Sequence, residues 1–252
     1  MISVLSFGLW DWVLLAIVSL QAAMVAYLYD PKWKALILTL PIPFTCAALA
    51  VGQDVNTYNV IGLAILILFI FSVQILHYQF EVSIYLSILV GILVYSGTSF
   101  AALKLIPSTN VTFWYSCLVI FLLSSAILAI VPVSISRGHR TSLPVLLKLP
   151  ILVCVILSII AVKKQLQGFV TVFPMIALIT AYEARHSLCV ISRQILVMVL
   201  ILLPMMIACY MTQSYLGLGK SLVVGWIVFC SLLFPVLRLT NSLPASTESD
   251  LP

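Results

Sequence analysis

The chain has 252 residues, of which 63% are hydrophobic and only 8% are Asp, Glu, Lys or Arg, and its mean hydropathy is +1.26. A water-soluble protein of that composition would have too few polar residues to cover its surface. The formal net charge of +5 is too small and too scattered for a nucleic-acid-binding surface. The composition therefore predicts an integral membrane protein whose main partner is the lipid bilayer.

Apolar runs long enough to cross a bilayer follow one another almost from end to end, since a spanning helix needs about 20 such residues. In chain order the predicted helices cover residues 11–29, 35–51, 59–76, 83–104, 112–133, 144–162, 169–182, 190–212 and 219–237. Turn-forming pairs such as Asp30-Pro31 and Arg137-Gly138 separate them. We therefore predict an all-α, polytopic membrane helix bundle of about nine transmembrane helices, followed by a disordered polar tail at 241–252.

The basic residues predict the orientation of this bundle. When the segments between predicted helices are assigned alternately to the two sides of the membrane, eight basic residues fall on one side, namely Lys32, Lys34, Arg137, Arg140, Lys148, Arg185, Arg193 and Arg238. The other side holds Lys104, Lys163, Lys164 and Lys220. Because basic residues concentrate in cytoplasmic loops, we expect the first side to be cytoplasmic. The N-terminus then lies outside and the C-terminus inside.

A shift of the chain against itself by 109 residues places Leu40-Pro41-Ile42 on Leu149-Pro150-Ile151, and His77 on His186. This predicts an extra N-terminal helix at 1–34, a first four-helix repeat at 35–133 and a second at 134–240. Each copy holds an even number of helices, so both would share one orientation, as in a parallel repeat.

The stretch GFVTVFPMIALITAY, which begins at Gly168, resembles the GlpM-type small inner-membrane proteins of about four helices. The residues that carry the likeness are Gly168, Phe173, Pro174, Ala177, Leu178, Ile179 and Tyr182. Good matching covers about a fifth of the chain. The first half lacks the Phe-Pro pair, and the loop after Tyr182 differs from the family pattern in length and charge. The resemblance implies a bacterial inner-membrane protein with a link to polysaccharide (alginate) production, but no defined biochemical role.

Polar residues near two predicted cytoplasmic helix ends form the candidate site. Glu183 and His186 are three residues apart and would share a helix face, and Gln74 and His77 have the same spacing in the other half. Together with Arg185, these residues would form a substrate-binding or gating mouth, because histidine titrates near neutral pH. The alternative is a set of interfacial charges that pair among themselves, as at many membrane-helix ends.

Pro174 lies in the middle of the predicted helix 169–182, where a proline removes a backbone hydrogen bond. Interrupted helices often flank the substrate site of a transporter, so Pro174 and Pro41 are candidates to border one. The alternative is ordinary packing, because neighbouring helices can satisfy the freed backbone groups.

Catalytic and metal-binding motifs are missing from the sequence, so we expect neither an enzyme nor a cofactor or metal site. The six cysteines form no cluster with metal-ligand spacing. No charged residue lies deep in a predicted helix, which argues against an ion-coupled pump.

Two functions stay open. A transporter or permease-like protein of unknown substrate would have a cleft bordered by Pro41, Pro174 and residues 95–99. A non-transporting scaffold or accessory subunit, in envelope polysaccharide biosynthesis if the resemblance holds, would be a solid bundle with small residues on its outer face. Such a subunit would pair with other membrane proteins or with further copies of itself.

Overall fold

The computed structural model describes residues 8–27, 37, 40–131, 157, 166–183, 185 and 187–242. The elements are α1 (Leu9–Tyr27), α3 (Ile42–Val51), α4 (Thr57–Tyr78), α5 (Ile84–Leu105), α6 (Asn110–Ile130), the 3₁₀ helix η1 (Gln167–Val172), α8 (Met175–Glu183) and α9 (Leu188–Ser242). No strand occurs within these ranges, so the all-α prediction is confirmed for this part of the chain. The predicted helix at 144–162 and the predicted tail at 241–252 lie largely outside it.

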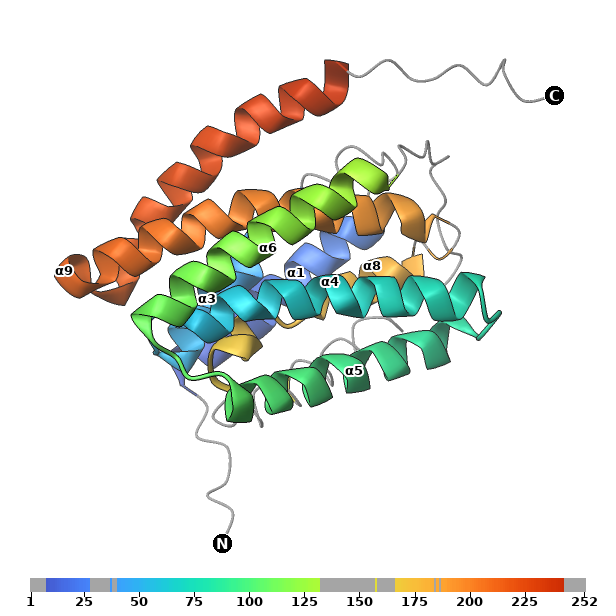
Figure 1. Ribbon diagram of the computed structural model, residues 1–252, viewed down its shortest axis with the longest axis horizontal. Helices are drawn as coiled ribbons and strands as arrows, with labels where there is room; N and C mark the ends of the chain where they lie inside the picture. Colours follow the sequence, from blue (N-terminus) through green and yellow to red (C-terminus); the bar gives the residue numbers. More distant parts are fainter. Residues whose placement is uncertain are drawn as a thin grey trace, which may run out of the picture.

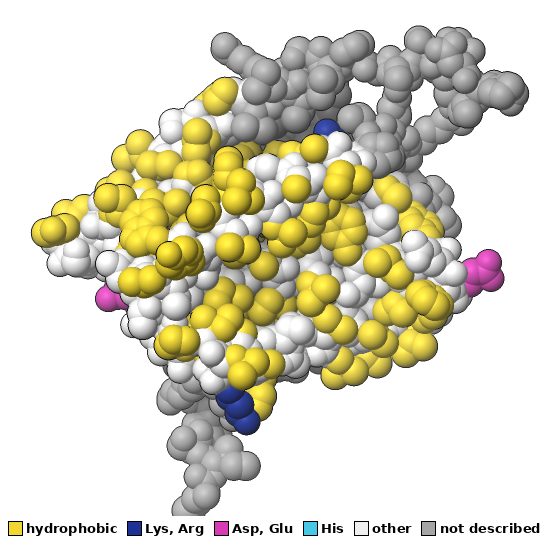
Figure 2. Space-filling view, viewed as in Figure 1, with side chains coloured by type: hydrophobic (Ala, Val, Ile, Leu, Met, Phe, Trp, Pro, Cys, Tyr) yellow, Lys and Arg dark blue, Asp and Glu magenta, His cyan; other side chains and the backbone are white. Residues whose placement is uncertain are grey.

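Among the described residues, four helices are long and apolar enough to cross a membrane, namely α4, α5, α6 and α9. Shorter apolar helices lie at Leu9–Gln21, Ile42–Val51 and Gln167–Glu183. The face of the molecule in Figure 2 is mostly apolar, and acidic side chains show only at its two edges. These features fit a membrane protein, although the expected count of about nine spans is not confirmed.

Helix α4 occupies the centre of the bundle, where it contacts α5, α6, α9 and η1 (Figure 1). Its apolar residues surround the helix axis, although one stripe that includes Leu68 and Ile75 is exposed. Phe69, Ile70 and Val73 are fully buried. Gly91 of α5 lets the two helices approach closely, because an added Cβ would lie 2.8 Å from Val73 Cγ2.

Helix α9 consists of two helical arms that meet at Gly217. This glycine has φ 73° and ψ 166°, a backbone conformation that side-chain-bearing residues rarely adopt. The break agrees with the two predicted helices at 190–212 and 219–237. The arms pack tightly near the turn, since a Cβ on Gly225 would lie 2.5 Å from Cys209 Sγ.

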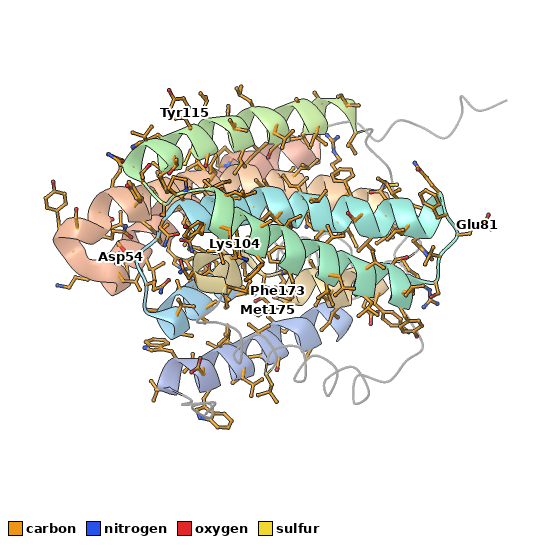
Figure 3. The ribbon with its side chains drawn as sticks, turned by 60° about the horizontal axis from the view of Figure 1, so that its bottom comes forward. Asp54, Glu81, Lys104, Tyr115, Phe173 and Met175 are labelled. Carbon is orange, nitrogen blue, oxygen red and sulfur yellow. The ribbon has the colours of Figure 1, made fainter. Side chains whose placement is uncertain are left out.

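The bundle has two ends, which we name after the residues that meet there. At the Asn56 end, Gln213 of α9 holds both backbone groups of Val55: the Val55 N–H donates to Gln213 Oε1 (2.8 Å) and Gln213 Nε2 donates to the Val55 carbonyl (2.9 Å). At the Tyr78 end, the Tyr78 hydroxyl donates to the Arg185 carbonyl (3.1 Å). Asp54 and Glu81 lie at these opposite ends (Figure 3).

Candidate functional site

The helix predicted at 169–182 is broken rather than continuous, and the break corrects the expectation that Pro174 lies inside a helix. We call residues 167–183 the interrupted segment. The 3₁₀ helix η1 ends at Val172, Phe173 is extended (φ −55°, ψ 136°), and α8 begins at Met175. Pro174 therefore directly precedes α8, where proline's missing N–H costs no hydrogen bond.

Side chains from α4 and α5 hold the first part of this segment in place. Asn59 Nδ2 donates to the Gly168 carbonyl (3.2 Å) and to Thr171 Oγ1 (2.8 Å). The Tyr95 hydroxyl donates to the Phe169 carbonyl (2.9 Å). Asn59 and Tyr95 are both buried. An interrupted helix leaves backbone groups without partners in their own segment, and in a membrane the protein has to supply those partners because lipid offers none.

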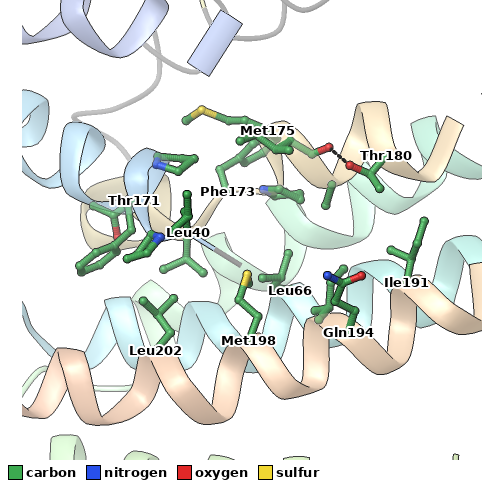
Figure 4. Close-up of a pocket in the computed structure, with 18 residues that line it drawn as sticks. Leu40, Leu66, Thr171, Phe173, Met175, Thr180, Ile191, Gln194, Met198 and Leu202 are labelled. Atoms are coloured by element: carbon green, nitrogen blue, oxygen red, sulfur yellow. Dashed lines mark hydrogen bonds between the residues drawn. The ribbon is translucent and has the colours of Figure 1, made fainter. Parts of the chain in front are cut away.

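A cavity of about 90 Å³ lies beside the break, and we call it the proline cavity (Figure 4). It is bounded by the start of α3, the interrupted segment, α4 and the first arm of α9. The lining residues are Leu40, Pro41, Pro43, Phe44, Leu66, Thr171, Val172, Phe173, Pro174, Met175, Ile176, Ala177, Thr180, Ile191, Gln194, Ile195, Met198 and Leu202. Prolines that are distant in sequence thus border one space.

Polar groups on the cavity wall are few. The Thr171 hydroxyl donates to the Gly168 carbonyl (2.7 Å), and the Thr180 hydroxyl donates to the Ile176 carbonyl (2.8 Å). Gln194 differs from both, because its Nε2 is buried and has no hydrogen-bond partner. The cavity therefore offers one unused amide donor among apolar side chains.

A second hollow, of about 470 Å³, opens at the Asn56 end, and we call it the polar pocket. Its lining residues are Gln53, Asp54, Val55, Asn56, Thr57, Ser108, Thr109, Asn110, Gln167, Tyr210 and Gln213. Several of these side chains already serve the fold: Asn56 caps α4, Thr109 caps α6, and Tyr210 donates to Asn110 Oδ1 (3.1 Å). Gln167 links the pocket to the interrupted segment.

Gln74 lies at the Tyr78 end, where its side chain contacts two residues of α9. Its Oε1 accepts a hydrogen bond from Ser192 Oγ (2.5 Å), and its Nε2 donates to Cys189 Sγ (3.4 Å). His77 Nδ1 lies 2.9 Å from the Val82 carbonyl, in the turn that follows its own helix. His186 lies outside the described residues, so a mouth that includes both histidines stays a prediction.

Glu183 and Arg185 also lie at the Tyr78 end. Glu183 is the last residue of α8, and only 2% of its surface is exposed. The Arg185 guanidinium lies 5.7 Å from the centre of the Tyr182 ring. Arg193 donates to the carbonyls of Leu128 and Val131 at the end of α6, where a positive charge is favourable. A shared mouth formed by these residues and Gln74 stays a prediction.

Three residues that organise the interrupted segment and its cavity are not among the predicted site residues: Asn59, Tyr95 and Gln194. Asn59 and Gln194 are amides within apolar helices, which is a sequence signal for a buried polar contact. Tyr95 lies in the stretch 95–99 that was expected to border a cleft. It packs instead behind Phe173, with ring centres 5.1 Å apart, and does not line the cavity.

Within the described ranges, no group of three or more His, Cys, Asp or Glu side chains lies close enough to hold a metal ion. No protein-family model, curated protein or solved structure matches the chain. The resemblance to the GlpM-type proteins therefore stays a prediction.

Proposed function

We propose that this protein is a permease-like transporter of the bacterial inner membrane, and that its substrate passes along the interrupted segment. One observation carries the proposal: the interrupted segment lines both hollows. Its first residue, Gln167, lines the polar pocket, and residues 171–177 line the proline cavity. Discontinuous membrane helices typically supply the substrate site of transporters.

The proposed transport is not coupled to an ion, because no described lining residue of either hollow is a deeply buried carboxylate. Asp54 in the polar pocket is exposed. The buried acids Asp11 and Glu183 lie in the first turn of α1 and at the last residue of α8. Ion-driven carriers usually keep such a group near the middle of the membrane. In the proposed orientation the Tyr78 end is cytoplasmic and the Asn56 end is outside.

Cysteine accessibility tests both the route and the orientation. In a variant without the six native cysteines, Thr171→Cys, Asp54→Cys and Glu81→Cys are treated with a membrane-impermeant maleimide in intact spheroplasts and in inverted vesicles. Asp54→Cys should react only from outside and Glu81→Cys only from the cytoplasm. Thr171→Cys, which is buried in this structure, should react from both sides because the substrate site opens to each side in turn.

The second candidate is the non-transporting scaffold, and one observation favours it. Gly97 and Ala101 lie one helical turn apart on the exposed side of α5, and a Cβ added to Gly97 would meet no neighbouring atom within 4 Å. Small residues with this spacing allow a second membrane helix to pack closely. A scaffold predicts that Thr171→Cys reacts from neither side, a result that would end the transport proposal.

A further inference from the structure

The proline cavity has the chemical character of a lipid-chain site with a single polar contact. Its walls are formed largely by Leu, Ile, Pro, Phe and Met side chains, and none of the described lining residues is charged. Met175 and Met198 contribute flexible thioether chains, which adapt to ligands of irregular shape. A charged ligand would find no counter-charge here and would lose its hydration. The ligand must therefore be neutral where it enters the cavity.

Gln194 supplies the polar contact. Its Nε2 is buried without a partner, whereas the Thr171 and Thr180 hydroxyls donate to the backbone of their own helices. Figure 4 shows Gln194 projecting from α9 into the same space as Leu66 and Phe173. A buried donor without an acceptor is rare and needs an explanation. A bound ligand that carries a hydrogen-bond acceptor would explain the unpaired Gln194 Nε2.

The size of the cavity limits the ligand further. About 90 Å³ is roughly six to nine times the space that one ordered water needs. Such a water also requires about two to four polar partners, and the apolar walls around Gln194 offer few. The volume suits a segment of hydrocarbon chain with one oxygen atom, and it is too small for a whole lipid.

We propose that the proline cavity binds the chain of a lipid-like substrate, and that a neutral ester, carbonyl or hydroxyl oxygen of this ligand accepts a hydrogen bond from Gln194 Nε2. The inference rests on the proposed transport function, for which it names the substrate class. Phe173 and Pro174 would border the hydrocarbon chain of the ligand. The break in the helix therefore provides the space for this hydrocarbon chain, which a continuous helix would fill.

Photo-crosslinking in lipid nanodiscs tests this site with the full-length chain. The first probe is a diacylglycerol with a diazirine near its ester group, and the second is an alkane diazirine of equal length without oxygen. Mass spectrometry should find both probes on Met175, Ile195 or Met198. Gln194→Met should lower cavity labelling by the diacylglycerol about threefold to tenfold, the range of one lost hydrogen bond, and should leave labelling by the alkane unchanged.

Two control variants complete the test. Met211→Leu changes an exposed residue of α9 that does not line the cavity, and it should label as the unmodified protein does. Ala177→Phe fills the cavity and should abolish labelling by both probes. The inference is overturned if Gln194→Met changes the labelling by both probes equally, or if labels appear only on the lipid-facing side of α6.

The accessibility of Thr171→Cys separates this inference from the proposed function. Labelling of Thr171→Cys from both sides, without probe in the cavity, overturns the lipid-chain site and leaves transport standing. If the probe labels the cavity but the maleimide labels Thr171→Cys from neither side, transport is overturned and the cavity holds a bound structural lipid.

Discussion

The hydrogen bond from Tyr95 to the interrupted segment leads to a prediction that a matched pair of variants can test. Tyr95→Phe removes one hydroxyl, which is fully buried and donates to the Phe169 carbonyl at 2.9 Å. Hydrogen bonds between membrane helices contribute about 0.6 kcal/mol on average and up to about 1.7 kcal/mol. Because Tyr95 is completely enclosed, we expect a loss in the upper part of this range, about 1–1.7 kcal/mol.

Tyr85→Phe is the control, because it makes the same chemical change on the same helix. Tyr85 is 64% exposed, and its hydroxyl donates to the Tyr182 hydroxyl at 3.1 Å. An exposed bond of this kind competes with solvent, so its removal should cost less than about 0.5 kcal/mol. The measurement is reversible unfolding of the detergent-solubilised protein by increasing denaturing detergent, followed by circular dichroism.

A loss of about 1 kcal/mol would lower the thermal midpoint by about 2–4 °C for a chain of this length. Tyr95→Phe should also speed the labelling of Thr171→Cys, since η1 would be held less firmly. If Tyr85→Phe destabilises the protein as much as Tyr95→Phe does, then α5 does not hold the interrupted segment through this bond.

Two further predictions concern close contacts made by glycines. Gly168→Ala should lower the thermal midpoint, because the new Cβ would lie 2.9 Å from Asn59 Oδ1, whereas Gly97→Ala, with nothing within 4 Å, should leave it unchanged or raise it slightly. Gly225→Ala should lower the midpoint by forcing the arms of α9 apart, because its Cβ would lie 2.5 Å from Cys209 Sγ. The double variant with Cys209→Ala should recover part of that loss, and equal midpoints for the single and double variants would contradict this packing.

Helix positions follow from hydropathy alone because each long apolar run has one low-energy conformation in lipid. The run predicted at 59–76 forms α4 at Thr57–Tyr78, and the run predicted at 83–104 forms α5 at Ile84–Leu105. The break before Pro174 does not follow in the same way, because hydropathy continues through Phe173 without a change. Its position depends on Asn59 and Tyr95, which are distant in sequence.

The contacts of the predicted site residues could not be predicted from the sequence either. A spacing of three residues indicates a shared helix face, but not which neighbour that face meets. Gln74 meets Ser192 and Cys189, and His77 contacts the turn beside it. Pro174 does border a cavity together with Pro41. This part could be predicted because a proline interrupts helical hydrogen bonding whichever helices lie beside it. The 109-residue repeat, the membrane orientation and the family resemblance stay predictions.

Two glutamines tie α4 to the first arm of α9 at opposite ends of their contact. Gln74 reaches from α4 to Ser192, and Gln213 reaches from α9 to the backbone of Val55, just before α4 begins. A pair of helices fastened at both ends cannot slide or tilt against each other without breaking these bonds. The two helices therefore form one wall of the proline cavity that resists relative movement, whereas among the described residues no glutamine bond of this kind holds α8 against them.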